Sequence, residues 1–322
     1  MGKDIEDSSL KTKTLDKVQT KSLNTDEILS LTSEIDFLNG DSSSQAQKLD
    51  ELVSSGDLSK WKSATKNLRT YPVSLNFLES RSDGKLTAER LGVGGEDDVS
   101  LDDFKYATLW VTGGSSLAAV GSLAFLPGDL GPTLCYLFAL IPILFLGVGS
   151  SAPGIIAGAI QATRGSNDDD ETRNERICRH EAGHFLCGYL CGLPVKNYEI
   201  TDTGFPCVEF HPSTETSAIT GKREFSREEI AALSVVALSG SVAEALKFEQ
   251  AKGGDNDLLE LDGLFRRSEE FIGAAKQQDL TRWGALASYQ IIKENLDTYE
   301  KLVNAFKEKK SVSECIAVIE SN

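Results

Sequence analysis

Hydrophobic positions divide this chain into three zones with different patterns. Between residues 25 and 91 they recur at helical spacing in a polar background, as at Ile28 and Ile35. Between residues 106 and 163 they run almost uninterrupted by charge. Beyond Glu175, amphipathic helical patterns surround two short segments with the alternation typical of strands. The chain is therefore predicted to be mainly α-helical, with one small β-hairpin.

The uninterrupted apolar zone contains two segments long enough to cross a membrane. A spanning helix needs about 20 apolar residues, and residues 108–126 and 134–150 come close to this length. The turn between them, PGDLGP at residues 127–132, carries Asp129 and neither Lys nor Arg. We therefore expect a transmembrane helical hairpin over residues 106–162, with both of its flanks on one side of the bilayer.

Shifts in composition indicate six parts along the chain. They are a disordered tail (1–25), a small helical domain (26–91), an acidic linker (92–105), the transmembrane hairpin (106–162), an acidic hinge (163–174) and a C-terminal domain (175–322). The tail has too few apolar side chains to offset the entropy lost on ordering. No charged region followed by an apolar run, the mark of a secretory signal, occurs in it. We interpret the small helical domain as an interaction or spacer domain.

Charge and cysteine content narrow the classes of function. The 322 residues carry a formal net charge of −16. Nucleic acid is not an expected partner, because binding phosphate needs a basic surface. Six cysteines occur without the paired C-x-x-C spacing of many zinc sites. We expect a reducing compartment, in which the cysteines are mostly small buried hydrophobic residues, with a cysteine-ligated zinc as the alternative.

Two of the three histidines, His180 and His184, lie four residues apart in ERICRHEAGHFLCGYLCG. On an α-helix this spacing puts both rings on one face, about 6 Å apart along the axis, where they can share a zinc ion. Glu181 then lies beside the metal and can accept a proton from zinc-bound water. The alternative is a surface His180 with a capped core His184. Gly183 and Gly188 each lower the stability of the helix by about 0.8–1 kcal/mol relative to Ala. Glycines at such positions indicate that another group approaches the helix closely.

Zinc needs a third protein ligand, and the neighbouring sequence does not supply one. The longer motif H-E-x-x-H-x-x-G-x-x-H fails, because residue 187 is Cys and residue 190 is Leu. Remote candidates are His211, Glu209, Glu244 and Asp257. Asp257 is expected in the first turn of a helix, where the helix dipole favours a carboxylate whether or not it binds metal.

Capping signals mark helix boundaries in the C-terminal domain. Ser226 and Glu229 form a capping box that begins a long helix, and Ser311 and Glu314 form another near the end of the chain. The predicted strands are residues 194–200 and 206–210.

Several blocks of the C-terminal domain together resemble a known family. They are ERICRHEAGHFLCGYL with PVKNYEI, then VVALSGSVAEALKF, then GGDNDLLELD. Their order and spacing over about residues 175–262 are similar to the peptidase domain of the FtsH family of membrane zinc proteases. The resemblance implies that His180, His184 and Asp257 bind zinc. It makes Glu181 the catalytic base and implies a zincin-like fold.

The chain departs from the family pattern in two respects. It has no G-x-x-x-x-G-K-[ST] phosphate loop, and only residues 164–175 separate the apolar zone from the peptidase-like domain, so the ATPase module is missing. The family block GGRAAEE reads SGSVAEA here, with Ser241 in place of the arginine and Ala245 in place of the second glutamate. The resemblance leaves His211 with a structural or substrate-side role.

The expected function is that of a membrane-anchored zinc metalloendopeptidase of FtsH type without its own ATPase, hydrolysing membrane or unfolded proteins. The alternatives are a catalytically weak membrane scaffold or assembly factor, and an accessory subunit of FtsH-type complexes. Expected partners are the lipid bilayer, protein substrates, and either FtsH-type ATPase-protease subunits or further copies of this chain. Relatives without the ATPase are familiar in photosynthetic organisms, so the resemblance implies a chloroplast membrane, thylakoid or inner envelope. Lys105 and Arg164 flank the hairpin and agree with soluble domains on the stromal side.

Overall fold

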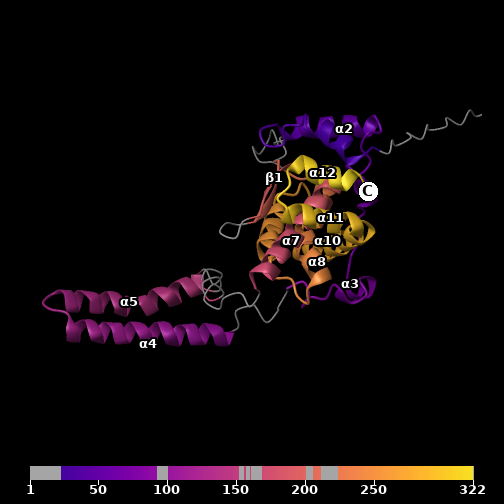
Figure 1. The fold of residues 1–322 in the computed structure, drawn as a ribbon. Helices are drawn as coiled ribbons and strands as arrows, with labels where there is room; N and C mark the ends of the chain where they lie inside the picture. The colour runs from indigo at the N-terminus through magenta and orange to yellow at the C-terminus, as the bar shows by residue number, and fades with distance from the viewer. Residues whose placement is uncertain are drawn as a thin grey trace, which may run out of the picture.

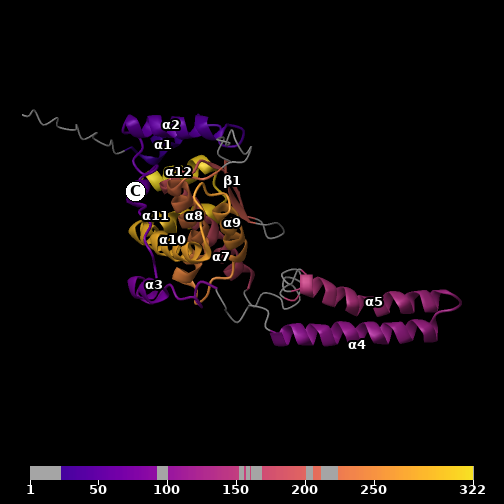
Figure 2. The ribbon, with the colours of Figure 1, turned by 180° about the vertical axis from the view of Figure 1, so that it is seen from behind.

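The computed structural model describes residues 23–92, 101–151, 156, 160, 169–200, 206–211 and 224–321. Within these ranges the protein is mainly helical, with eleven α-helices and one two-stranded sheet. Most helices form one body, and the hairpin of α4 and α5 projects from it (Figures 1 and 2). The expected disordered tail lies almost wholly outside the described residues. So do most of the acidic linker and the first part of the acidic hinge.

Helices α4 (Leu101–Phe125) and α5 (Leu130–Ser151) form an antiparallel pair. Of the described helices, three are long and apolar enough to cross a membrane, and the third is α8 (Arg227–Lys247). Other parts of the protein bury 78% of the most apolar stretch of α8, but only 17% of that of α4 and none of that of α5. Helix α8 is therefore a core helix, whereas α4 and α5 leave their apolar side chains uncovered.

Small residues bring the two hairpin helices together beside the turn. Ser122 Oγ lies 2.7 Å from the Ala119 carbonyl oxygen and 3.1 Å from that of Gly131. A Cβ atom at Gly131 would lie 2.9 Å from the Ser122 carbonyl oxygen, so only glycine permits this approach. Near the open end, the rings of Phe104 and Phe145 lie 5.8 Å apart between centroids. The hairpin is thus closed by packing along its length.

Five helices build most of the body. They are α7 (Asp170–Leu190), α8, α10 (Ala274–Glu294), α11 (Leu296–Lys307) and α12 (Val312–Glu320). Both predicted capping boxes are confirmed: Ser226 with Glu229 begins α8, and Ser311 with Glu314 begins α12. Helix α7 is buried continuously over residues 178–190, because other elements cover it on every side.

The predicted β-hairpin is confirmed as an antiparallel ribbon of β1 (Val195–Glu199) and β2 (Cys207–Phe210). Its inner face packs on the body, where the Tyr198 ring stacks on Phe306 at 4.0 Å between centroids. The ring of Phe210 occupies the space where a side chain at Gly188 would lie. The ribbon is thereby held against the C-terminal end of α7.

The N-terminal region contains α1 (Thr25–Thr32), α2 (Ser42–Ser54), a 3-10 turn (Thr65–Asn67) and α3 (Leu75–Arg81). Its apolar side chains belong to the same hydrophobic core as those of the body. Gln45 Nε2 donates to the Val195 carbonyl oxygen at 2.8 Å, and Arg90 Nη2 donates to the Ala245 carbonyl oxygen at 2.7 Å. The region expected as a small helical domain is helical and packs directly on the C-terminal body.

One carboxylate near the end of the chain joins the N-terminal region to α7. Glu320 accepts hydrogen bonds from the backbone N–H groups of Ser59, Lys60 and Trp61, at 2.7 to 3.1 Å. The Tyr189 hydroxyl donates to the same carboxylate at 2.7 Å. Glu320 therefore connects α12, α7 and the segment after α2.

Candidate metal centre

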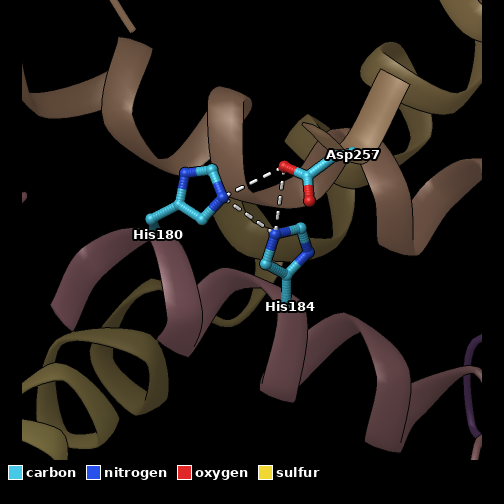
Figure 3. Close-up of side chains that lie close together, drawn as sticks. All are labelled: His180, His184 and Asp257. Atoms are coloured by element: carbon cyan, nitrogen blue, oxygen red, sulfur yellow. Dashed lines mark hydrogen bonds and ion pairs between the residues drawn. The ribbon is translucent and has the colours of Figure 1, made fainter. Parts of the chain in front are cut away.

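His180, His184 and Asp257 point toward one another in the interior of the body (Figure 3). His180 Nε2 lies 2.9 Å from His184 Nε2 and 3.1 Å from Asp257 Oδ2. His184 Nε2 lies 3.4 Å from the same carboxylate oxygen. The three potential ligand atoms lie within 4.8 Å of one another, and this group could hold a metal ion.

Helix α7 places the two imidazoles on the face that meets α8. Gly183, between them, makes this meeting close: a Cβ atom there would lie 2.7 Å from the Ser239 carbonyl oxygen and 3.0 Å from Ala243 Cβ. The expectation that the α7 glycines allow a close approach is confirmed, since α8 meets Gly183 and Phe210 meets Gly188.

Asp257 enters the site from α9 (Asp255–Phe265), in the first turn of that helix. The side chain is 22% exposed, more than those of the two histidines. The preceding Gly253 and Gly254 pass close to the site, and a Cβ atom at Gly253 would lie 3.0 Å from the His180 ring. These glycines let the chain turn into α9 directly beside the first histidine.

Glu244 holds the outer nitrogen of His180. Its Oε1 lies 2.7 Å from His180 Nδ1, and Arg176 Nη1 donates to Oε2 at 2.8 Å. The backbone N–H groups of Lys252 and Gly253 donate to the same carboxylate at 3.0 and 3.2 Å. A carboxylate with this many donors is an acceptor for His180 Nδ1–H, which leaves the Nε2 lone pair for a metal.

The outer nitrogen of His184, Nδ1, is likewise held by an oxygen acceptor, in this case a backbone carbonyl. Its Nδ1 lies 2.8 Å from the Val236 carbonyl oxygen, which can only accept, so Nδ1 carries the hydrogen. Its Nε2 faces His180 and Asp257. Both imidazoles therefore present Nε2 to the common centre.

Glu181 is buried beside the pair, with 5% of the residue exposed. Its Oε2 has no hydrogen-bond partner among the described residues. Burial raises the pKa of this carboxyl group, although the neighbouring histidines and a backbone hydrogen bond to Val208 act in the opposite direction. An unpartnered buried carboxylate oxygen is costly, and it is suited to a ligand or water at the centre.

Opposing effects set the pKa values of the converging groups. Burial alone would lower the pKa of His180, but hydrogen bonds to Asp257 and Glu244 outweigh it and raise this pKa to about 10. Burial would raise the pKa of Asp257, yet hydrogen bonds to His180 and His184 bring it well below its usual range. Without metal, the centre retains a proton where a cation would bind, so protons and metal compete for the same atoms.

The donor set fits a divalent transition metal. Two imidazole nitrogens and one carboxylate oxygen leave a further coordination position open, as catalytic zinc sites do. Gly240 provides room, because a Cβ atom there would overlap the His180 ring. No cysteine belongs to this group, and all six cysteines are free thiols in the described residues.

The other candidates for the third ligand lie elsewhere. Glu244 contacts the outer nitrogen of His180, away from the common centre. Glu209 is exposed on β2 and pairs with Lys196 at 3.0 Å. His211 Nε2 lies 2.6 Å from the Phe37 carbonyl oxygen, which gives this histidine a contact with the N-terminal region.

Some residues that shape the centre could not be found from the sequence pattern. Arg176 balances Glu244, and Ser239 lies beside His184. In the sequence, the only indication of close packing near these positions was the presence of glycines in the neighbouring segments, at Gly240 and at Gly253.

Comparisons with family models, with curated proteins and with solved structures found no match to this chain.

Proposed function

We propose that this protein is a membrane-anchored zinc metalloendopeptidase of FtsH type that lacks its own ATPase. The observation that carries the proposal is the unpartnered Oε2 of Glu181, buried next to three converging ligand atoms. A structural metal site requires no such carboxylate, whereas a hydrolytic site requires a base.

Each residue of the centre has a separate task in this proposal. His180, His184 and Asp257 would hold zinc, which supplies Lewis-acid activation of a peptide carbonyl and of water. Glu181 accepts a proton from the attacking water and returns it to the leaving amine; its raised pKa suits both transfers. Glu244 and the Val236 carbonyl fix the imidazoles so that both Nε2 atoms face inward.

The hairpin supports the membrane part of the proposal. Helices α4 and α5 are each 22 residues long over their apolar part and are largely uncovered. In water this surface would aggregate, whereas a bilayer covers it. We place the body on one side of a chloroplast membrane, on its stromal face, where it would act on unfolded segments or exposed tails of membrane proteins.

A catalytically weak membrane scaffold, or an accessory subunit of FtsH-type complexes, is the second candidate. The observation that favours it is the low exposure of the centre: both histidines and Glu181 are almost wholly buried. Ser241 is also buried and lies against Gly254, so the arginine of the resembling family's block has no room at this position.

The test uses the full chain in detergent or nanodiscs. Bound zinc is measured by mass spectrometry, and casein cleavage is measured for the wild type, Glu181→Gln and the exposed control Glu209→Gln. We expect one zinc per chain in all three, and cleavage in the wild type and in Glu209→Gln only. Zinc without cleavage in any of them supports the scaffold, and absence of zinc refutes the metal centre.

Membrane anchoring is tested separately by alkaline carbonate extraction. Ile143, in the middle of α5, is exposed and would face lipid. Arginine at the centre of a spanning helix costs about 2.5–3.5 kcal/mol, so Ile143→Arg should increase the extractable fraction. Phe271→Arg, at an exposed position of the body, is the matched control and should stay in the membrane pellet.

A further inference from the structure

Ser239 lies at a junction of three buried polar groups behind His184. Its Oγ is 2.6 Å from the Val236 carbonyl oxygen and 3.2 Å from His184 Nδ1. His184 Nδ1 is itself 2.8 Å from the same carbonyl oxygen. Ser239 is fully buried, so the hydrogen bonds at this junction are made within the protein.

The Val236 carbonyl oxygen can only accept hydrogen bonds, and this fixes which atom donates in each of these contacts. The short contact from Ser239 Oγ assigns the hydroxyl hydrogen to the Val236 carbonyl oxygen. The remaining lone pairs of Oγ then face the Nδ1–H group of His184, which has two acceptors in front of it. Two acceptors at different positions restrain the rotation of the ring more than one does.

We propose that Ser239 is a positioning residue that holds the His184 ring in the orientation required for metal binding; this inference rests on the metal site proposed above. The hydroxyl contacts the His184 ring, the Val236 carbonyl oxygen and the neighbouring Cys187 thiol, and it reaches the metal position through the imidazole. Partners of this kind, behind a metal ligand, typically change metal affinity by 10–100-fold when they are removed.

Ser234 offers a matched control on the same helix. It is fully buried, and its Oγ donates to a carbonyl oxygen of its own helix, that of Ile230, at 2.7 Å. Ser234→Ala and Ser239→Ala therefore remove the same atoms from equally buried positions of α8. They differ in that Ser239 contacts His184 and also the Cys187 thiol, whereas Ser234 contacts a backbone carbonyl alone.

The experiment measures zinc affinity by chelator competition, and zinc release by a colorimetric chelator, for the full chain in detergent. We expect Ser239→Ala to bind zinc about tenfold more weakly and to release it faster. Ser234→Ala should match the wild type in both measurements. Wild-type affinity and release in Ser239→Ala, or an equal loss in both variants, would overturn the inference.

A second readout needs no metal. The chain has three histidines, so ¹⁵N-histidine labelling gives few ring signals to assign. We expect a stable Nδ1–H signal from His184 in metal-free wild type and an averaged or broadened signal in Ser239→Ala. Identical spectra of metal-free wild type and Ser239→Ala would refute the role of Ser239, whether or not the chain binds zinc. Absence of zinc binding in the wild type would instead refute the metal site, so the two failures can be told apart.

Discussion

His180 Nδ1 and Glu244 Oε1 lie 2.7 Å apart, on the side of the imidazole ring that faces away from Asp257. The same carboxylate is neutralised by Arg176 and receives two backbone N–H groups. The orientation of the first histidine is therefore set by α8 and by the segment before α9, and a change at Glu244 should reach the metal position without touching it.

Replacing Glu244 tests this dependence. Glu244→Ala removes the acceptor of His180 Nδ1–H and the carboxylate that pairs with Arg176, so we expect zinc affinity to fall by about 10–100-fold. We also expect the free energy of unfolding to fall by about 3–5 kcal/mol, because a buried ion pair loses one member. Chelator competition and urea unfolding measure the two effects. Glu249→Ala, at an exposed position, is the control and should bind zinc as the wild type does. Wild-type zinc affinity in Glu244→Ala would refute the role of Glu244.

Gly240 should tolerate no side chain, because a Cβ atom there would overlap the His180 ring. Gly240→Ala is expected to lower zinc affinity by about 10–100-fold, since the ring must turn away from the centre. Gly263, in α9, has open space around its Cβ position and is the matched control. Gly263→Ala should stabilise the protein by up to about 1 kcal/mol through helix propensity. Equal zinc affinity in the two variants would contradict the geometry.

The hydrogen bonds of Glu320 predict a loss of stability that spreads to the N-terminal region. Glu320→Ala leaves the N–H groups of residues 59–61 and the Tyr189 hydroxyl unpaired, which should cost about 2–3 kcal/mol. Hydrogen exchange should accelerate at residues 59–61 before it does in α10. Glu308→Ala removes only a surface ion pair with Lys310 and should change stability by about 0.5 kcal/mol or less. Unchanged exchange at residues 59–61 in Glu320→Ala would contradict this.

Four buried thiols should be inert in the folded protein. Burial raises the pKa of Cys178 to about 11 and those of Cys191 and Cys315 to about 12, and it raises the pKa of Cys187 well above its usual value. At pH 8 a thiol of pKa 12 is ionised to on the order of one part in 10⁴. Maleimide labelling followed by peptide mass spectrometry should therefore modify these four only after denaturation. Cys207, half-buried on β2, should react first in the body.

The same thiols predict how stability depends on pH. Their folded pKa values lie above the unfolded value, so their contribution is complete below about pH 8.5 and declines as the unfolded chain ionises above it. The free energy of unfolding should fall between about pH 9 and 11, and replacing Cys191 with Ala should reduce that slope. A slope that does not depend on the cysteines would contradict the assignment.

Local signals in the sequence predicted much of the secondary structure. The capping boxes at Ser226 and Ser311 and the β-ribbon depend on residues close together in the chain, and all are confirmed. The convergence of His180 with His184 follows from helical periodicity. That Asp257 joins them came from a resemblance between several blocks, because spacing alone left four candidates for the third ligand.

Contacts between distant segments could not be predicted from local patterns. Glu244 was a candidate ligand by residue type, and only the packing of α8 on α7 shows that its carboxylate meets the outer nitrogen of His180. Composition also separated residues 26–91 from the C-terminal domain, whereas Gln45, Arg90 and Glu320 join the two through hydrogen bonds. Such contacts depend on tertiary geometry, which no single segment encodes.

The bonds from Glu320 to Ser59 and Trp61 also constrain the order of biosynthesis. Ribosomes deliver the chain from its N-terminal end, so residues 59–61 and then the apolar hairpin are translated well before Glu320. The loop closed by Glu320 encloses both hairpin helices and α7. In the proposed membrane protein, the hairpin is therefore available for insertion into lipid before Glu320 can make its contact with residues 59–61.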